Sequence, residues 1–163
     1  MNDTLDQTGI NAPSKQRLRL WLRLLKTSRL IENQLREKLR SEFASTLPRF
    51  DVLAALSRYS DGLKMSQISG VLKVSNGNVT GIVDRLAADG LLVRVAVQGD
   101  RRASLVRLTL KGREEFQRQA DAHEAWINGL LSDFSAPEAN DIARRLEALE
   151  IGLTDESDVQ NAQ

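Results

Sequence analysis

The sequence contains no cysteine, and its 163 residues include a single histidine, His123. Without cysteine the chain can form neither a disulfide framework nor a Cys-based metal site, and it has no thiol nucleophile. One histidine is also too few to complete a zinc site when no cysteine is present. We therefore predict neither a metal site nor a cofactor.

Long hydrophobic runs are also missing, because no stretch approaches the roughly 20 apolar residues that cross a bilayer. The N-terminal sequence MNDTLDQTGINAPS has neither the basic region nor the apolar region of a signal peptide. We therefore expect a cytoplasmic protein with no membrane partner.

Catalytic motifs are equally scarce. The sequence contains no GxSxG, P-loop or HExxH pattern, and one histidine cannot supply the relays of nucleophilic enzymes. Asp84 and Asp89 are close in the sequence, but both fall in the predicted helix at residues 74–90, whose polar face indicates a binding role and not catalysis. We therefore expect that the chain is not an enzyme.

Charge is unevenly distributed, although the formal net charge is only +1. Residues 15–40 contain nine Lys/Arg and two Glu, and residues 92–118 contain seven Lys/Arg and three acids. Residues 119–163 contain ten acids and two Arg. Local fields of this kind govern binding to polyanions.

The stretch Val74–Gly90 predicts the most informative helix of the chain. Ser75 is a suitable N-cap, and Gly90 is a suitable C-terminal stop. Apolar residues recur with helical spacing at Val79, Ile82, Val83 and Leu86. Small, amide, hydroxyl or cationic residues occupy the opposite face, namely Asn76, Gly77, Asn78, Thr80, Gly81 and Arg85. Such a face suits a DNA major groove, where Asn can bind adenine and Arg can bind guanine; the alternative is an ordinary amphipathic surface helix.

Two shorter segments precede this helix. Pro48 suits the first turn of a helix that runs to about Tyr59. Ser66 is predicted to cap a short third helix and to join the DNA contacts. Two helices joined by a tight turn, the second with the polar face, form a helix-turn-helix arrangement.

A β-hairpin is predicted after the polar-faced helix. Leu91–Val97 and Ala103–Thr109 have strand patterns, and a Gln-Gly-Asp turn joins them. The tip holds Asp100, Arg101 and Arg102. Arginines at such a tip can reach phosphates or enter the minor groove. Asp100 is expected to pair with one of them; the alternative is a simple turn residue.

Long helices are predicted on both sides of this region, so the fold class is mainly α with a small β-hairpin wing. The first runs from about Lys15 to Ser41, and its apolar stripe is too broad for one small domain, which indicates burial in a second subunit. Two further helices, Thr109 to about Leu131 and Pro137 to about Ile151, follow the hairpin. The predicted divisions are a flexible tail (1–14), an N-terminal dimerisation helix (15–46), a winged helix-turn-helix domain (47–112), C-terminal dimerisation helices (113–153) and an acidic disordered tail (154–163).

Three segments resemble the MarR family of bacterial transcriptional regulators: LPRFDVLAAL, SQISGVLKVSNGNVTGIVDRLAADGLL and GDRRASLVRLTLKG. The likeness covers about residues 47–115. It implies a homodimeric repressor or activator that binds a pseudo-palindromic operator in double-stranded DNA and a small, often aromatic effector. For this chain we expect a repressor that the effector releases from the operator. Opposite charges on residues 15–40 and 119–163 would also attract one another across subunits. Gly81 departs from the family, where many members carry a basic or bulky residue, so the operator need not be the usual one.

The first helix carries cations that either form a solvated face or bind an anionic effector: Arg17, Arg19, Arg23, Lys26 and Arg29. The segment VSNGNVTG resembles the reading helix of family members that respond to hydroxycinnamoyl-CoA or other aromatic acyl-CoA thioesters. The phosphates of such an effector would need several cations. Trp21 and His123 are further candidates for the effector site. The alternatives are dimer core for Trp21 and Trp126, and a structural or surface role for His123.

A winged helix can also dock a protein partner instead of reading DNA. A partner-docking surface should expose apolar anchors. The basic wing and the amide-rich helix favour DNA.

Overall fold

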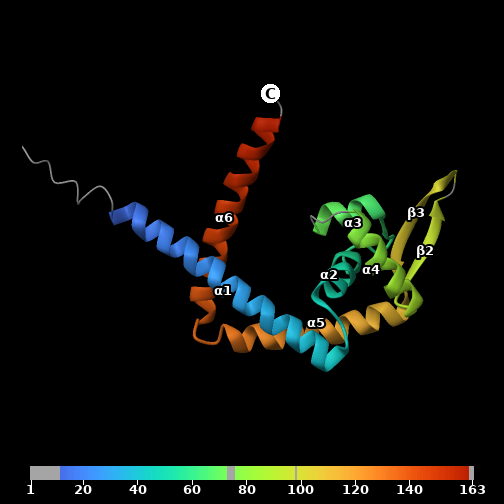
Figure 1. Ribbon diagram of the computed structural model, residues 1–163, viewed down its shortest axis with the longest axis horizontal. Coiled ribbons are helices and arrows are strands. Elements are labelled where there is room, and N and C mark those ends of the chain that lie inside the picture. The colour runs from blue at the N-terminus through green and yellow to red at the C-terminus, as the bar shows by residue number, and fades with distance from the viewer. Residues whose placement is uncertain (1–11, 73–75, 98, 162–163) are drawn as a thin grey trace, which may run out of the picture. The chain divides into compact units, whose positions relative to one another are not determined.

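The computed structural model describes the backbone of residues 12–72, 76–97 and 99–161 (Figure 1). These residues are mainly helical with one small antiparallel sheet, as the sequence predicted. The helices are α1 (Ala12–Phe43), α2 (Leu47–Ser57), α3 (Met65–Leu72), α4 (Asn76–Ala88), α5 (Leu110–Leu130) and α6 (Ala136–Asn161). The strands are β1 (Leu63–Lys64), β2 (Leu92–Val97) and β3 (Asp100–Leu108). The described residues divide into two compact units, with the boundary between Glu124 and Ala125.

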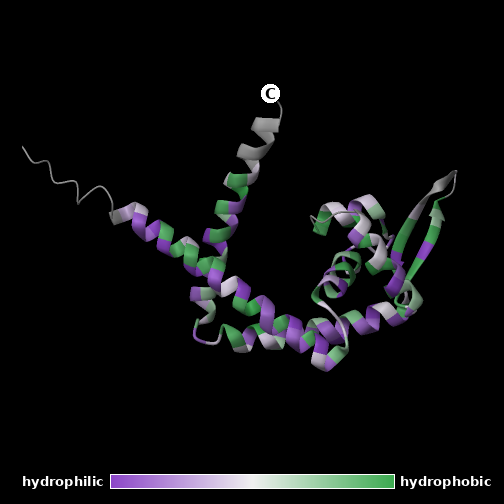
Figure 2. Cartoon of the chain, viewed as in Figure 1, coloured by the Kyte–Doolittle hydropathy of each residue, from purple (hydrophilic) through white to green (hydrophobic). Residues whose placement is uncertain are grey.

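No helix in the described part of the chain is long and apolar enough to span a membrane. Figure 2 shows that apolar residues along the helices alternate with polar ones rather than forming continuous bands.

Helix α1 carries an apolar stripe of which only one end is buried. Leu35 and Leu39 are 6% and 0% exposed. The large side chains nearer the N-terminus are 52–60% exposed, namely Leu18, Leu20, Trp21, Leu22 and Leu30. In a single chain this part of the stripe therefore remains open to solvent.

Helix α2 begins with a side-chain cap that the sequence prediction overlooked. Thr46 has an extended backbone and its Oγ1 accepts a hydrogen bond from the Arg49 amide at 3.4 Å. Pro48 lies in the first turn, as predicted, where its missing N–H costs nothing. The helix contributes a buried face of Phe50, Val52, Leu53, Ala55 and Leu56.

The sheet has three strands in the order β1-β3-β2, one more than the predicted hairpin. Leu63 of β1 pairs with Val106, and Leu92 of β2 pairs with Leu108. The sequence prediction missed β1 because two residues are too few to show an alternating pattern. Gly62 leads into β1 with a φ of 93°, a left-handed conformation that favours glycine.

The helix predicted at 74–90 forms as α4, and its apolar face is the centre of the core. Val79, Val83 and Leu86 are all 0% exposed. They pack in one cluster with residues of α2, α3 and the sheet. The predicted cap Ser75 lies outside the described residues.

The predicted stop of this helix at Gly90 is confirmed. Gly90 has a φ of 76°, its amide donates to Ala87 O at 2.9 Å, and the Leu91 amide donates to Leu86 O at 3.0 Å. These two bonds form a Schellman motif, which satisfies carbonyls at the helix end.

The predicted N-cap of α3, Ser66, was wrong. The helix begins at Met65, so Ser66 lies within its first turn and does not cap it. The Gln67 side chain instead turns back, and its Oε1 accepts a hydrogen bond from the Lys64 amide at 2.8 Å. A glutamine at this position offers a longer reach to the preceding amide than serine would.

Helix α5 begins after Thr109, as predicted, and Thr109 bonds in two directions. Its Oγ1 accepts from the Gly112 amide at 2.9 Å and donates to Gly90 O at 2.7 Å. The backbone amide of Thr109 also donates to Leu91 O at 3.0 Å. One residue therefore ties the start of α5 to the end of α4.

Helix α6 is longer than the sequence predicted. Ser135 donates to Glu138 Oε2 from its amide at 2.8 Å and from its hydroxyl at 2.6 Å, which fixes the first turn. We predicted an end near Ile151, but the helix continues through Asn161, so the predicted end was wrong. No proline or glycine follows Gly152, so no residue with strong helix-breaking chemistry ends it earlier.

Candidate nucleic-acid interface

Helix α4 presents its predicted polar face to solvent. Gly77, Asn78, Thr80, Gly81 and Arg85 are all exposed, while the apolar face behind them is buried. Asn76 is the first residue of the helix, but its side chain lies outside those described. The structure therefore exposes every described side chain that we assigned to base reading.

Two glycines on this face are not required by packing within the chain. A Cβ added at Gly77 or Gly81 would meet nothing within 4 Å. Glycine within a helix costs about 0.5–1 kcal/mol relative to alanine, so their presence has a stability cost without an internal benefit. Because neither glycine has a side chain, another molecule can approach the helix backbone closely at these two positions.

An ion pair joins the side of α4 to the wing. Asp84 Oδ1 lies 2.5 Å from Arg94 Nη2 of β2. We had considered Asp84 only as a catalytic candidate; the structure instead places it in a contact that sets the helix against the sheet. Pairing also neutralises an acid that would otherwise repel DNA phosphates.

The wing has the predicted tight turn. Gly99 has a φ of 89°, and β3 begins at the next residue, Asp100. The side chains of Asp100, Arg101 and Arg102 lie outside those described, so the predicted pairing of Asp100 is not tested. The structure places these three residues in β3, so the returning strand begins at Asp100 and not at Ala103 as predicted.

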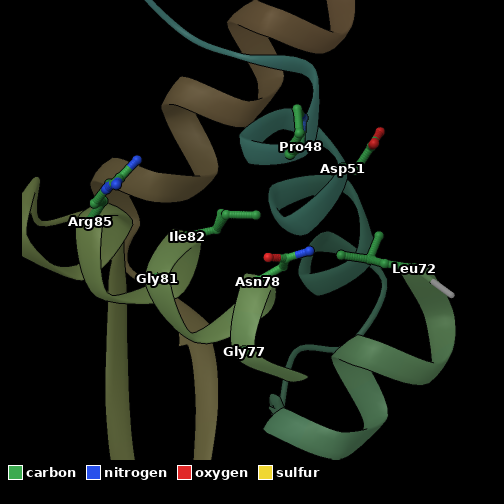
Figure 3. A pocket seen from close by; sticks show the side chains of 8 residues that line it. All are labelled: Pro48, Asp51, Leu72, Gly77, Asn78, Gly81, Ile82 and Arg85. Carbon is green, nitrogen blue, oxygen red and sulfur yellow. The ribbon is translucent and has the colours of Figure 1, made fainter. Parts of the chain in front are cut away.

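A pocket of about 450 Å³ lies beside the polar face, between α2, α3 and α4 (Figure 3). Figure 3 shows Asn78 and Ile82 extending from α4 toward the other two helices. The pocket is lined by Pro48, Asp51, Leu72, Gly77, Asn78, Gly81, Ile82 and Arg85. Four predicted DNA-reading residues therefore also form the wall of a pocket, which the sequence alone did not reveal.

Asp51 supplies a carboxyl group to this pocket. Burial raises the pKa of Asp51, and the nearby Glu32 acts in the same direction. His123 and Arg36 lower the pKa, and they do not cancel the effect of burial. A pocket with this carboxyl and the Arg85 guanidinium can accept hydrogen bonds on one side and donate them on another.

A second pocket of about 510 Å³ shares Pro48, Ile82 and Arg85 with the first. It adds two arginines of α1, Arg36 and Arg40, which pair with acids of the same helix. Exposed pairs of this kind are weak and can be exchanged for a ligand anion. We did not single out either arginine, because helical spacing alone does not show what α2 and α4 bring beside them.

The predicted effector residues of α1 lie elsewhere. All five cations are exposed, and none lines either pocket: Arg17, Arg19, Arg23, Lys26 and Arg29. Trp21 is 56% exposed and lines neither pocket.

His123 belongs to an aromatic cluster. Its ring stacks on Phe50 with 4.8 Å between centroids and 19° between planes, and Phe50 lies 5.8 Å from Phe116. This contact favours the structural role that we weighed for His123 over direct ligand binding. Among the described residues no group of acids and histidine has the arrangement of a metal site.

Comparison with known proteins agrees with this geometry. The model of the MarR family matches residues 46–103, from the start of α2 into the wing. The HTH-type transcriptional regulator PecS of Dickeya dadantii is 32% identical over 129 residues, which cover 78% of this chain and 77% of PecS. The transcriptional activatory protein BadR of Rhodopseudomonas palustris is 31% identical over 134 residues, which cover 80% of this chain and 74% of BadR.

A solved structure is similar over nearly its whole length. The MarR family transcriptional regulator from Silicibacter pomeroyi superposes with a TM-score of 0.72 at 32% identity, covering 87% of this chain and 98% of that one. These relatives are transcriptional regulators and not enzymes.

Proposed function

Since the chain belongs to the MarR family of transcriptional regulators, we propose that it reads a pseudo-palindromic operator as a homodimer and responds to a small effector. MarR regulators bind DNA as dimers and respond to small-molecule ligands. The observation that carries the proposal is the exposed polar face of α4, which lies opposite the fully buried Val79, Val83 and Leu86 and is followed directly by a wing. A protein of this kind acts in the cytoplasm, where bacterial DNA lies.

Base reading is assigned to Asn78 and Arg85. Asn76 and Thr80 are assigned further polar contacts, and the two glycines allow DNA to approach the helix backbone closely. Asn binds adenine and Arg binds guanine through paired hydrogen bonds in the major groove. The wing residues Arg101 and Arg102 are assigned to phosphates or the minor groove. Ser66, near the start of α3, and Ser75 are assigned to the DNA backbone.

Dimerisation is assigned to the long helices. The exposed leucines and Trp21 of α1 form apolar surface that a monomer would leave in water. Helix α6 has its own exposed apolar face, comprising Ile142, Leu146, Leu149 and Leu153 at 37–56% exposure. A second copy of the chain would bury both surfaces.

Selection from a random duplex library at about physiological salt tests the proposal. We expect enrichment of a two-fold symmetric motif with half-sites about one helical turn apart. Retention of every sequence with a steep salt dependence would contradict sequence-specific reading. No retention of duplex DNA would favour the partner-docking alternative.

The effector is assigned to the pocket between α2, α3 and α4. Its apolar walls suit a small planar ring, Asp51 can accept a hydrogen bond, and Arg85 can bind a carboxylate. Because Asn78 and Arg85 also belong to the DNA-reading face, a bound effector would compete with DNA for the same side chains. This argument favours a repressor that the effector releases, although the related BadR is named an activatory protein.

An aromatic acyl-CoA is the larger alternative effector. The second pocket would place the phosphates of such a ligand beside Arg36, Arg40 and Arg85, and not beside the cations nearer the N-terminus of α1. Calorimetric titration with a hydroxylated aromatic acid and with its CoA thioester separates the two. Binding of the acid alone would assign the first pocket, and binding of the thioester alone would require both.

A further inference from the structure

The C-terminal end of α4 carries an acid where a helix disfavours one. Asp89 directly follows α4, and its side chain lies where the helix dipole is negative. The Schellman bonds at Gly90 and Leu91 already close the helix end, so the Asp89 carboxylate is not needed for capping. Its position therefore calls for a partner outside the helix.

That partner is Arg49 in the first turn of α2. Arg49 Nη2 lies 2.5 Å from Asp89 Oδ2, and 40 positions separate the two residues in the sequence. Arg49 also carries a charge that its own helix disfavours, because a cation near a helix N-terminus is repelled by the positive end of the helix dipole. Two charges that each oppose their own helix are thus matched to one another.

The pair lies at the edge of a polar junction, with the Asp89 side chain 53% exposed. The Arg49 side chain is 22% exposed, and its Nε is buried with no hydrogen-bond partner among the described residues. Lys111 of α5 donates from Nζ to the Asp89 carbonyl at 2.8 Å. Arg49, Asp89 and Lys111 all line one cavity of about 190 Å³, so α2, α4 and α5 meet there.

The core packing of α4 and the Thr109 bonds at its end hold the helix in place, and the two ion pairs add directional contacts at its surface. Its buried side chains make apolar contacts, which are non-directional. A guanidinium–carboxylate contact is directional, because the donors of Arg lie in a fixed plane. Asp84 and Arg94 fix the side of α4 toward the wing, and Arg49 and Asp89 fix its end toward α2.

We propose that Arg49 and Asp89 are positioning residues that set the angle at which α4 enters the major groove. The proposal rests on the proposed function, since it assumes that α4 reads DNA. Base contacts need donor–acceptor geometry within a few tenths of an ångström, so a small rotation of α4 weakens them. Phosphate contacts made by long side chains on the wing tolerate such a rotation.

Asp89→Asn tests the proposal, because positioning and simple electrostatics predict opposite changes in the affinity for the operator. Loss of a negative charge near DNA should by itself strengthen binding to every duplex. Positioning instead predicts a loss of about tenfold in affinity for the selected operator, the size of a coupling within one polar network. Affinity for an unrelated duplex should not fall, so the specificity ratio should drop.

Arg49→Met provides the second arm, since methionine keeps much of the apolar stem without the charge. The double variant Asp89→Asn/Arg49→Met should bind the operator within about twofold of Asp89→Asn alone, because the two residues act through one contact. If Arg49 touched a phosphate itself, its loss would lower the salt slope by about 0.9, and the losses would add. Asp133→Asn, which removes an exposed acid from the α5–α6 connection, is the matched control and should leave the specificity ratio unchanged.

The outcomes are distinguishable. A wild-type chain that selects no motif would overturn the proposed function and this inference with it. A wild-type motif that Asp89→Asn binds as tightly, or more tightly, would overturn the inference alone. A lower specificity ratio with an unchanged melting temperature supports positioning over general destabilisation.

Discussion

Asp84 of α4 and Arg94 of β2 form an ion pair across 2.5 Å, which joins α4 to the first strand of the wing. The two side chains are 60% and 39% exposed, so water screens the contact. Its contribution to the stability of the fold is therefore small, since exposed pairs contribute about 0–1 kcal/mol.

A double-mutant cycle at this pair measures how much the ion pair contributes to stability. Asp84→Asn, Arg94→Gln and the double variant should give a coupling below about 1 kcal/mol in urea unfolding. Operator affinity should fall more than stability does, because the wing loses its fixed place beside α4. A coupling above about 2 kcal/mol would mean that the pair is chiefly a stabilising contact.

Gly81→Ala should separate stability from DNA binding. The added methyl meets none of the described residues within 4 Å, so the variant should gain about 0.5–1 kcal/mol of helix stability. The same methyl stands on the face assigned to the groove and should weaken operator binding. Thermal melts and operator titrations measure the two effects, and unchanged affinity would mean that DNA does not approach this position closely.

Gly112→Ala should be among the most damaging small substitutions in the chain. Its Cβ would lie 1.9 Å from the Leu91 carbonyl oxygen, so the start of α5 would have to move away from the end of α4. Overpacking of this kind costs about 1–3 kcal/mol or more. Gly129→Ala in the same helix, where nothing lies within 4 Å, is the control and should be neutral or stabilising in the same unfolding experiment.

Arg102→Ala and Asn78→Ala should impair binding in different ways. Loss of a phosphate contact at Arg102 should weaken all sequences and lower the slope of log K against log salt by about 0.9 per contact. Loss of a base contact at Asn78 should change the preferred base at one position of each half-site, at a cost of about 1–3 kcal/mol on the wild-type operator. Unchanged affinity for Arg102→Ala would contradict the assigned role of the wing.

Asp51→Asn should stabilise the protein at neutral pH while weakening effector binding. Burial raises the pKa of Asp51 in the folded chain, so its ionised form destabilises the fold at pH values above that pKa. The advantage of the variant should shrink as the pH falls through the folded pKa, because the wild-type carboxyl then becomes protonated. Melting temperatures across this range measure the effect, and a gap that widened toward low pH would contradict it.

Local chemistry explains why much of the fold could be predicted. The spacing of Val79, Val83 and Leu86 places one face of α4 in the core, and Gly90 ends the helix because its left-handed conformation costs glycine little. The wing followed from a strand pattern and a glycine turn. Each of these signals lies within one turn or one hairpin, so no distant contact was needed to read it.

Elements without a local signal could not be predicted in this way. Strand β1 exists only because β3 lies beside it, and α6 continues past its predicted end because acidic polar composition does not itself stop a helix. The cations at the start of α1 formed a clear pattern, yet the arginines of α1 that line the second pocket are Arg36 and Arg40, nearer its other end.

The sequence by itself determined which residues form α4, its buried face and the wing hairpin, because these depend on periodicity and turn chemistry. Only the tertiary structure decided which side chains meet across helices. It brought Asp51 of α2 to the pocket that Arg85 of α4 also lines, and it paired Arg49 with Asp89 over 40 positions of chain. Such contacts form when the buried faces of different helices pack together and bring polar side chains near one another. The spacing of residues along the chain does not show which of these side chains will meet.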